Sequence, residues 1–254
     1  MQANNRIETI RDGERKYHEA CYDNYKLFEA GSWLHKPVKT VMETLKQFED
    51  YGELTVLDLG CGVGRNSIPL AESIKSRSGV GRNSIPLAES IKSRSGVVVC
   101  VDLLESALSK LKSYSREYGV SDNIESALSD IGNYEIAANQ YDYIVAVSAL
   151  EHVASEQQLV QVLGRMVSGT KANGINCIIM STNIEEIEMD SGIQLEPLME
   201  LNMTTGKAEE LLARAYKGWK VLYTTVKPLQ FNIERDGSSV ILKSDCVTYV
   251  VQEA

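Results

Sequence analysis

The sequence predicts an α/β fold in which helices cover both faces of a mostly parallel sheet. An apolar run, Leu54–Leu59, leads directly into the glycine-rich turn Gly60–Gly64 and the start of a helix. Two further apolar runs, Val97–Val101 and Tyr141–Val147, are followed by polar residues. Strands that are apolar along their whole length are typical of parallel sheets buried on both faces. A chain of 254 residues is long enough for one such domain, 1–254, with a large core.

The glycine-rich turn is typical of a nucleotide-binding loop. Gly60, Gly62 and Gly64 allow the backbone to turn sharply and to approach a ligand without a Cβ in between. A dinucleotide site has the spacing Gly-x-Gly-x-x-Gly, but the last position counted from Gly60 is Arg65. The spacing therefore disfavours NAD. For the turn taken alone, a strand-to-helix connection that binds nothing is the alternative.

The order acid-x-Gly-x-Gly-x-Gly, from Asp58 to Gly64, resembles the first motif of class I S-adenosylmethionine (SAM) methyltransferases. In that family the loop passes beneath the amino-acid part and the ribose of the cofactor. The resemblance covers roughly residues 50 to 252 and implies a doubly wound, mostly parallel, seven-stranded, Rossmann-like sheet. The stretch Leu59–Ser67 and the Gly218-Trp219 ending resemble the branch related to tellurite-resistance methyltransferases, which act on small molecules.

Acidic residues at strand ends extend the resemblance. Asp102 follows the second strand, where its two carboxylate oxygens would accept hydrogen bonds from both ribose hydroxyls. Asp130 is expected beside the adenine amino group, although Asp-Ile-Gly is also an ordinary loop entry. The resemblance implies cofactor contacts from Asp58, Gly60, Cys61, Gly62, Gly64, Asn66, Asp102, Leu103, Asp130, Ile131 and Ser148.

A tandem duplication separates the glycine loop from Asp102. Residues Gly62–Ser78 recur letter for letter as Gly79–Ser95. The distance from Gly64 to Asp102 is 38 residues, of which 17 belong to the second copy; the remaining 21 match the spacing of about 20 in a βαβ nucleotide site. The repeat therefore accounts for the unusual spacing.

The first copy is expected to form the helix, because it follows directly on Asp58 and the glycine loop. One helix through both copies would place Pro86 in its interior, at a cost of about 3 kcal/mol. Residues 79–95 are therefore predicted to be an extruded insert, and limited proteolysis should cut after Lys92 or Arg94 before it cuts at Arg65.

The other predicted elements follow from apolar spacing and capping residues. Ser155 and Gln158 have the spacing of a capping box at the start of a helix. Strands are predicted over Ile124–Ile131, Ile175–Ser181, Trp219–Tyr223, Phe231–Ile233 and Val247–Val251, and a helix over Lys207–Tyr216.

Three segments are candidates for the acceptor side of the site. Residues 1–37 form a predicted helical lid, because they are rich in aromatic residues, among them Trp33; plain packing is the alternative. Residues 182–205 are either a substrate cap or a solvated connector. His152 follows the fourth strand, where an imidazole can act as a general base or simply pack in the turn.

The composition of the chain narrows the possible cellular compartment and the possible binding partners of the protein. The net charge of −9 disfavours nucleic acid, and no run approaches the 18 or so apolar residues of a membrane span. Five cysteines without C-x-x-C spacing indicate reduced thiols, with neither a metal site nor disulfides, and a cytoplasmic location is expected. A monomer or a dimer is compatible with the sequence, and the duplicated helix offers a route to a swapped dimer.

The resemblance implies that the protein transfers a methyl group from SAM to a small-molecule acceptor and releases S-adenosylhomocysteine (SAH). Since SAM carries the reactivity, the protein chiefly aligns the reactants, and no catalytic residue is assigned. Two alternatives stay open. One is a non-catalytic protein that binds SAM or SAH and whose turnover is blocked by the duplication; the other is an NAD-dependent oxidoreductase, which the glycine spacing disfavours.

Overall fold

The computed structural model describes residues 2–77, 96–235 and 237–254 of the chain. The second copy of the repeat, and with it the predicted insert at 79–95, lies outside the described residues. The first copy supplies a helix, α3 (Ser67–Arg77), directly after the glycine loop. Ile68, Leu70 and Ile74 of this helix are fully buried, so the first copy packs as part of the domain.

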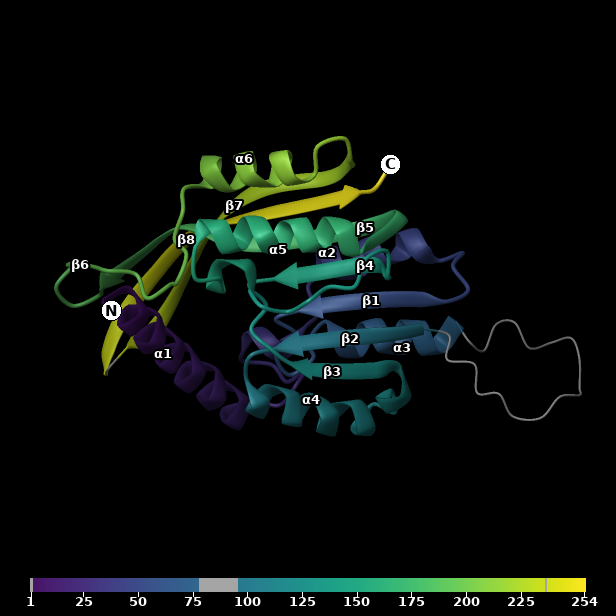
Figure 1. Ribbon diagram of the computed structural model, residues 1–254. Coiled ribbons are helices and arrows are strands. Elements are labelled where there is room, and N and C mark those ends of the chain that lie inside the picture. Colours follow the sequence, from purple (N-terminus) through teal and green to yellow (C-terminus); the bar gives the residue numbers. More distant parts are fainter. Residues whose placement is uncertain (1, 78–95, 236) are drawn as a thin grey trace, which may run out of the picture.

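The helices and strands alternate along most of the chain (Figure 1). The helices are α1 (Gln2–Asn24), α2 (Lys39–Leu45), α3, α4 (Glu105–Glu117), α5 (Glu156–Gly169) and α6 (Thr205–Ala215). The strands are β1 (Leu54–Leu59), β2 (Gly96–Asp102), β3 (Ile124–Leu128), β4 (Tyr141–Val147), β5 (Thr170–Glu188), β6 (Gln194–Leu195), β7 (Lys220–Arg235) and β8 (Ser238–Gln252).

The sheet has the strand order β3-β2-β1-β4-β5-β8-β7, and the short β6 pairs with β5. The first five strands are parallel, whereas β8 lies antiparallel between β5 and β7. This arrangement confirms the predicted doubly wound, mostly parallel sheet, with β6 as an addition to its seven main strands. The chain reverses its direction of winding at β1, so the carboxyl ends of β1, β2 and β4 meet where such folds bind ligands.

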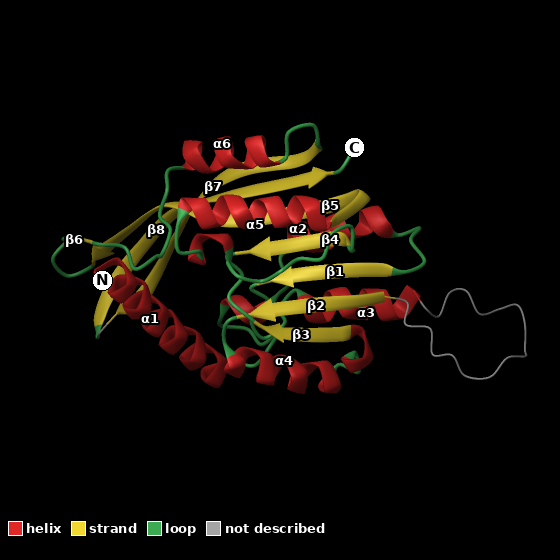
Figure 2. Cartoon of the chain, viewed as in Figure 1, coloured by secondary structure: helices red, strands yellow, loops and turns green. Residues whose placement is uncertain are grey.

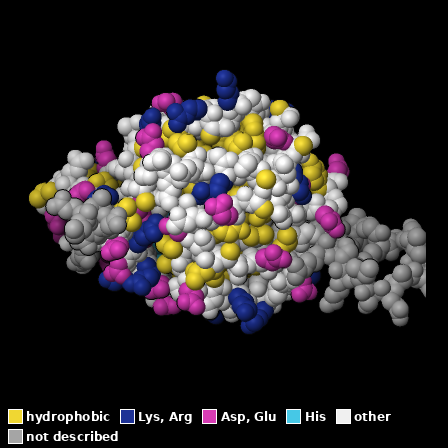
Figure 3. All heavy atoms as spheres, viewed as in Figure 1, with side chains coloured by type: hydrophobic (Ala, Val, Ile, Leu, Met, Phe, Trp, Pro, Cys, Tyr) yellow, Lys and Arg dark blue, Asp and Glu magenta, His cyan; other side chains and the backbone are white. Residues whose placement is uncertain are grey.

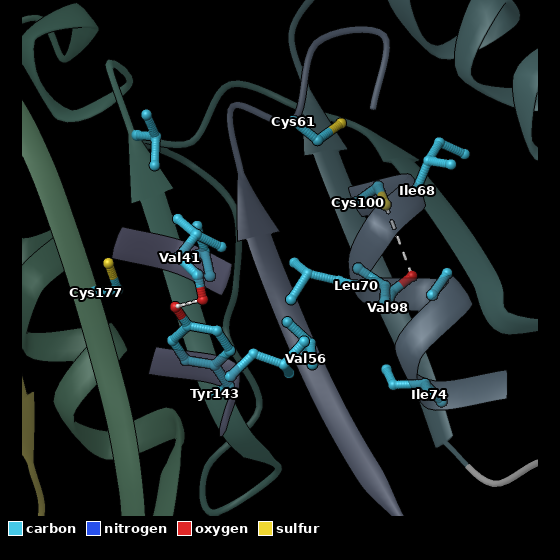
Figure 4. Packing of buried hydrophobic residues seen from close by; sticks show 14 of the residues in the cluster. Val41, Val56, Cys61, Ile68, Leu70, Ile74, Val98, Cys100, Tyr143 and Cys177 are labelled. Atoms are coloured by element: carbon cyan, nitrogen blue, oxygen red, sulfur yellow. Dashed lines mark hydrogen bonds between the residues drawn. The ribbon is translucent and has the colours of Figure 1, made fainter. Parts of the chain in front are cut away.

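Helices cover both faces of the sheet (Figure 2). Because side chains alternate along a strand, Val56 points to the face covered by α2, α3 and α4, and Leu57 points to the face covered by α5 and α6. Tyr143 of β4 is fully buried, and its hydroxyl donates to the carbonyl of Val41 at 3.1 Å (Figure 4). This bond lets a polar ring fill the core beside β1 without an unpaired hydroxyl.

The predicted helix start at Ser155 is confirmed, because its hydroxyl accepts from the amide of Gln158 at 3.2 Å. The strand lengths differ from the prediction. Strand β3 ends at Leu128, so Asp130 lies in the following loop. Strands β5, β7 and β8 pair over long stretches, and residues 182–188 therefore continue β5, while β7 is one strand from Lys220 to Arg235. Cross-strand pairing overrides the weak alternation of these segments.

Candidate active site

The glycine loop joins the carboxyl ends of β1 and β2. The amides of Gly60 and Cys61 donate to the carbonyl of Val101 at 2.8 and 3.0 Å, which fixes the loop to the end of β2. Gly60 has a φ of 72°, and a Cβ at this position would lie 2.5 Å from the Cβ of Ala149. Glycine is therefore required here both by the left-handed backbone and by the close approach of the turn that follows β4.

Asp102 lies at the end of β2, with one carboxylate oxygen bonded to the glycine loop and the other bonded at the start of α4. Oδ2 accepts from the amide of Gly62 at 2.8 Å, and Oδ1 accepts from the amide of Leu104 at 2.9 Å. Burial raises the pKa of Asp102, and these two hydrogen bonds oppose that rise. Each carboxylate oxygen can accept more than one hydrogen bond, so each retains acceptor capacity for a ligand.

The surroundings of Asp102 fit the ribose and adenine of SAM. Leu103 is 46% exposed, and it offers an apolar side chain next to the carboxylate. Ile131, which follows β3, is buried except for 8% of its surface. A carboxylate that can accept from a diol, beside an exposed apolar side chain, suits the ribose and the adenine of a nucleoside.

Asp58 and Asn66 tie the loop to its neighbours. The carboxyl of Asp58 is buried and accepts from the hydroxyl of Ser67 at 2.6 Å, and burial raises the pKa of Asp58 to about 7. Asn66 is buried, and its side-chain oxygen accepts from the amide of Val38 at 2.9 Å. Both predicted cofactor residues thus hold the loop through contacts within the protein.

Asp130 is joined to helix α1. Its Oδ2 accepts from the guanidinium of Arg11 at 2.7 Å, and its Oδ1 accepts from the amide of Gly132 at 2.7 Å. Arg11 also lies 3.4 Å from the buried carboxylate of Glu200. Asp130, which is expected to face adenine, is therefore linked through Arg11 to Glu200 in the segment that precedes α6.

His152 also contacts the carboxylate of Glu200. Its Nδ1 lies 3.0 Å from Oε2 of Glu200, and 28% of its side chain is exposed. Burial alone would lower the pKa of His152, but the bond to Glu200 and the charges of Glu151 and Glu14 raise this pKa to about 9. In this arrangement the imidazole of His152 is a cation at neutral pH and cannot accept a proton.

Replacing Glu200 by glutamine is expected to lower the free energy of unfolding more at pH 6 than at pH 9.5. A histidine with a raised pKa stabilises the fold below its ordinary pKa of about 6.5, and this contribution is lost as the pH rises through about 9. Urea unfolding at both pH values measures the difference. Glu196→Gln is the matched control, since Glu196 is exposed and its ion pair within the described part of the chain is with Arg6. An equal effect of Glu200→Gln at both pH values would contradict the coupling to His152.

Helix α1 crosses the carboxyl ends of the parallel strands, beside the arrowheads of β2 and β3 (Figure 1). Near its start, Arg6 donates to Glu196 at 3.0 Å and to the carbonyl of Pro197 at 3.2 Å. Near its end, Lys110 of α4 donates to the carbonyl of Tyr22 at 2.9 Å. The surface around α1 mixes acidic and basic side chains, at the lower left of Figure 3. Polar contacts therefore hold both ends of this helix.

The face of α1 that looks toward the glycine loop carries aromatic and ionisable side chains. Tyr22 is buried, and its hydroxyl lies 3.1 Å from where a Cβ of Gly62 would be. Trp33 lies beside Tyr22, with ring centres 6.1 Å apart, and the guanidinium of Arg65 lies 5.0 Å from the centre of the Trp33 ring. Trp33, predicted as an acceptor contact, thus belongs to a cluster against the cofactor loop.

Ser148 occupies the turn after β4, with a left-handed φ of 49° and its amide bonded to the carbonyl of Ile179 at 2.8 Å. The turn thus brings Ser148, Ala149 and His152 to the edge that holds Asp102. Sequence reasoning placed Tyr22 in the aromatic segment but missed the α1 residues Arg11, Glu14 and His18, and also Glu200. Helical spacing of the three α1 residues is the signal that would have found them.

The described part of the chain contains no group of three or more His, Cys, Asp and Glu side chains arranged to hold a metal ion. Within residues 2–77, 96–235 and 237–254, no helix combines the length and the apolar character needed to span a bilayer.

Comparison with known proteins identifies the family. Residues 51–218 match a family model described as a methyltransferase domain. A ubiquinone biosynthesis O-methyltransferase from Rickettsia canadensis is 27% identical over 132 residues, which cover 52% of this chain and 44% of that protein. The chain thus spans less than half the length of this curated relative.

Solved structures show the same fold. TehB from Haemophilus influenzae superposes with a TM-score of 0.59 at 21% identity, covering 85% of this chain and 62% of that chain. A SAM-dependent methyltransferase from Methanosarcina mazei superposes with a TM-score of 0.55 at 13% identity, covering 85% of this chain and 98% of that chain. Since the family model matches well over half of its length, the chain belongs to the methyltransferase-domain family and has the class I, SAM-dependent methyltransferase fold.

Proposed function

We propose that this protein transfers the methyl group of SAM to a small-molecule acceptor. One observation carries the proposal: Asp102 is held between the glycine loop and the start of α4, with one backbone amide on each carboxylate oxygen and acceptor capacity to spare on both. Family membership supports it, because the first motif and the acid after β2 fall within the matched residues. The name of the curated relative supports an oxygen atom as the acceptor.

The chemistry of the bound cofactor is that of an activated methyl group on a positively charged sulfur. The residues of the chain have three tasks. Asp102 and the glycine loop hold the nucleoside, so that the methyl group has a fixed position. The turn carrying Ser148 and Ala149 forms the side from which an acceptor approaches. Helix α1 excludes water by covering this edge of the sheet.

Incubation with methyl-labelled SAM and a low-molecular-weight cell extract tests the proposal. We expect label to appear in a small molecule, together with stoichiometric SAH. Binding of SAH without any label transfer would instead support the alternative of a cofactor-binding protein that has no turnover. A protein that binds neither SAM nor SAH would contradict both.

We further infer that α1 is a lid that opens for exchange of the cofactor. Its inner face carries the buried Ile10 and Tyr22, but polar contacts hold both of its ends. Arg11 is the central contact, because it joins Asp130 and Glu200 across the site. Lids that are held by a few ion pairs can open on the timescale of turnover.

Replacing Arg11 by glutamine is expected to speed the dissociation of SAH roughly tenfold, because the central polar contact of the lid is lost. Stopped-flow displacement of bound SAH measures this rate. Arg15→Gln is the matched control: Arg15 lies on the same helix, half of its side chain is exposed, and its ion pair among the described residues is with Asp12 of α1. Equal rates of SAH dissociation in the two variants would rule out Arg11 as the contact that holds the lid closed.

A further inference from the structure

We propose that Arg165 of helix α5 is a positioning residue for the cofactor: it holds the loop after β3 so that Asp130 selects adenine over hypoxanthine. This inference rests on the proposed function and concerns how the site recognises the base of its cofactor. It assigns a role to a helix that covers one face of the sheet and contributes no residue to the predicted cofactor contacts.

Arg165 directs its guanidinium at the backbone of the loop that follows β3. Its Nη2 donates to the carbonyl of Gly132 at 2.7 Å and to the carbonyl of Ile131 at 3.3 Å. Hydrogen bonds from a charged donor are stronger than those between neutral groups. Nε of Arg165 is buried and has no hydrogen-bond partner within the described residues. Such a nitrogen lowers stability, so a gain in stability alone does not explain why an arginine lies here.

Helix α5 gives Arg165 a fixed base. The helix lies along the sheet beside β4 and β5 (Figure 1). Its apolar face is fully packed, because Leu159, Val162, Leu163 and Met166 are all buried. A side chain carried by a helix that is packed in this way starts from a well-defined position. Arg165 can therefore fix the loop relative to the sheet.

The loop also packs directly against α5. A Cβ at Gly132 would lie 2.2 Å from the side-chain nitrogen of Gln158. Gln158 is itself held, because its side-chain oxygen accepts from the amide of Ala154 at 2.7 Å. The side chain of Ile131 is buried in the apolar cluster that also contains Leu159. The loop therefore has little room to shift toward α5.

The carboxylate of Asp130 is fixed by the same loop. Its Oδ1 accepts from the amide of Gly132 at 2.7 Å, and its main-chain carbonyl accepts from the amides of Asn133 and Tyr134 at 2.9 Å. Arg165 bonds to the carbonyl of that same glycine. A shift of Gly132 would therefore move the carboxylate as well.

The position of this carboxylate determines which base fits beside it. An ionised carboxylate can only accept hydrogen bonds. Adenine presents an amino group, which donates, where hypoxanthine presents a carbonyl, which accepts. A site built to bond a donor rejects an analogue that lacks it, because the acceptor of the site is then left unpaired. Arg11 also bonds to Asp130, at 2.7 Å, but it reaches the side chain and does not hold the backbone of the loop.

Calorimetric titration with SAH and with S-inosylhomocysteine, in which hypoxanthine replaces adenine, tests the proposal. Wild type is expected to bind SAH at least about tenfold more tightly than the analogue. Arg165→Gln should weaken the binding of SAH about tenfold and that of the analogue much less, so that the ratio of the two dissociation constants moves toward one. Arg165→Lys should recover part of this ratio, because an ammonium group can still donate to one carbonyl.

Arg214→Gln, which removes an exposed arginine from α6, is the matched control and should keep the wild-type ratio. Cooperative urea unfolding shows that each variant is folded. If Arg165→Gln does not fold, Arg165→Lys takes its place, with a smaller fall in the ratio expected.

A merely structural role of Arg165 would weaken the binding of both ligands by the same factor, and this result would overturn the proposal. Equal affinity of wild type for SAH and the analogue would also overturn it, while the proposed function would stand. Absence of SAH binding by wild type would overturn the proposed function itself.

Discussion

Replacing Asp102 by alanine is expected to weaken SAH binding by about 100-fold or more. A hydrogen bond to a charged group contributes about 1.5–3 kcal/mol, and the carboxylate is positioned to accept two of them from a ribose. Since 1.4 kcal/mol corresponds to a factor of ten, the loss of both exceeds a factor of 100. The substitution also removes the acceptor for the amide of Gly62, which loosens the loop beneath the ligand.

Isothermal calorimetry with SAH measures the effect, and Asp122→Ala is the matched control. Asp122 is exposed and precedes β3, so it lies at the opposite edge of the sheet from the site. The control should bind SAH like wild type, and both variants should unfold cooperatively. If Asp102→Ala kept wild-type affinity, the placement of the ribose at β2 would be wrong.

Replacing Gly60 by alanine is expected to lower the free energy of unfolding by about 2–4 kcal/mol. The new Cβ would lie 2.5 Å from the Cβ of Ala149, and neither atom is at the end of a flexible side chain. The φ of 72° adds the strain of a left-handed backbone. Relief requires the loop or the turn after β4 to move, so SAH affinity should fall as well.

Urea unfolding of Gly164→Ala provides the control, for which the expected change in the free energy of unfolding has the opposite sign. Gly164 lies in the middle of α5, and no atom of the described residues lies within 4 Å of a Cβ built there. Alanine at this position should raise stability by up to about 1 kcal/mol. If Gly60→Ala were as stable as wild type, the loop and the β4 turn would not be in the close contact described here.

The centre of the fold could be predicted because its signals are local. Strands β1, β2 and β4 are mainly apolar runs, and the helix start at Ser155 depends on a residue three positions away. The glycine loop and Asp102 could be paired in advance because a βαβ unit fixes their spacing once the second copy of the repeat is subtracted.

The side-chain contacts of α1 and the strand lengths could not be predicted, because they depend on residues that are distant in the sequence. Arg11 meets Asp130 across 119 positions of the sequence, and nothing in the composition of α1 indicates this partner. The same is true of His152, whose charge is set by Glu200, 48 positions away. The lengths of β5 and β7 were underestimated for a similar reason, since their pairing with β8 determines where they end. The glycine loop and the strands beside it were therefore predictable, and the contacts between segments distant in the sequence were not.

We propose that the glycine loop and Asp102, at the carboxyl ends of β1 and β2, bind the nucleoside of SAM. Calorimetric titration of the wild-type protein with SAH tests this binding directly. We expect saturable binding to one site, with no heat from NAD at the same concentrations. Absence of SAH binding by a cooperatively folded protein would contradict it.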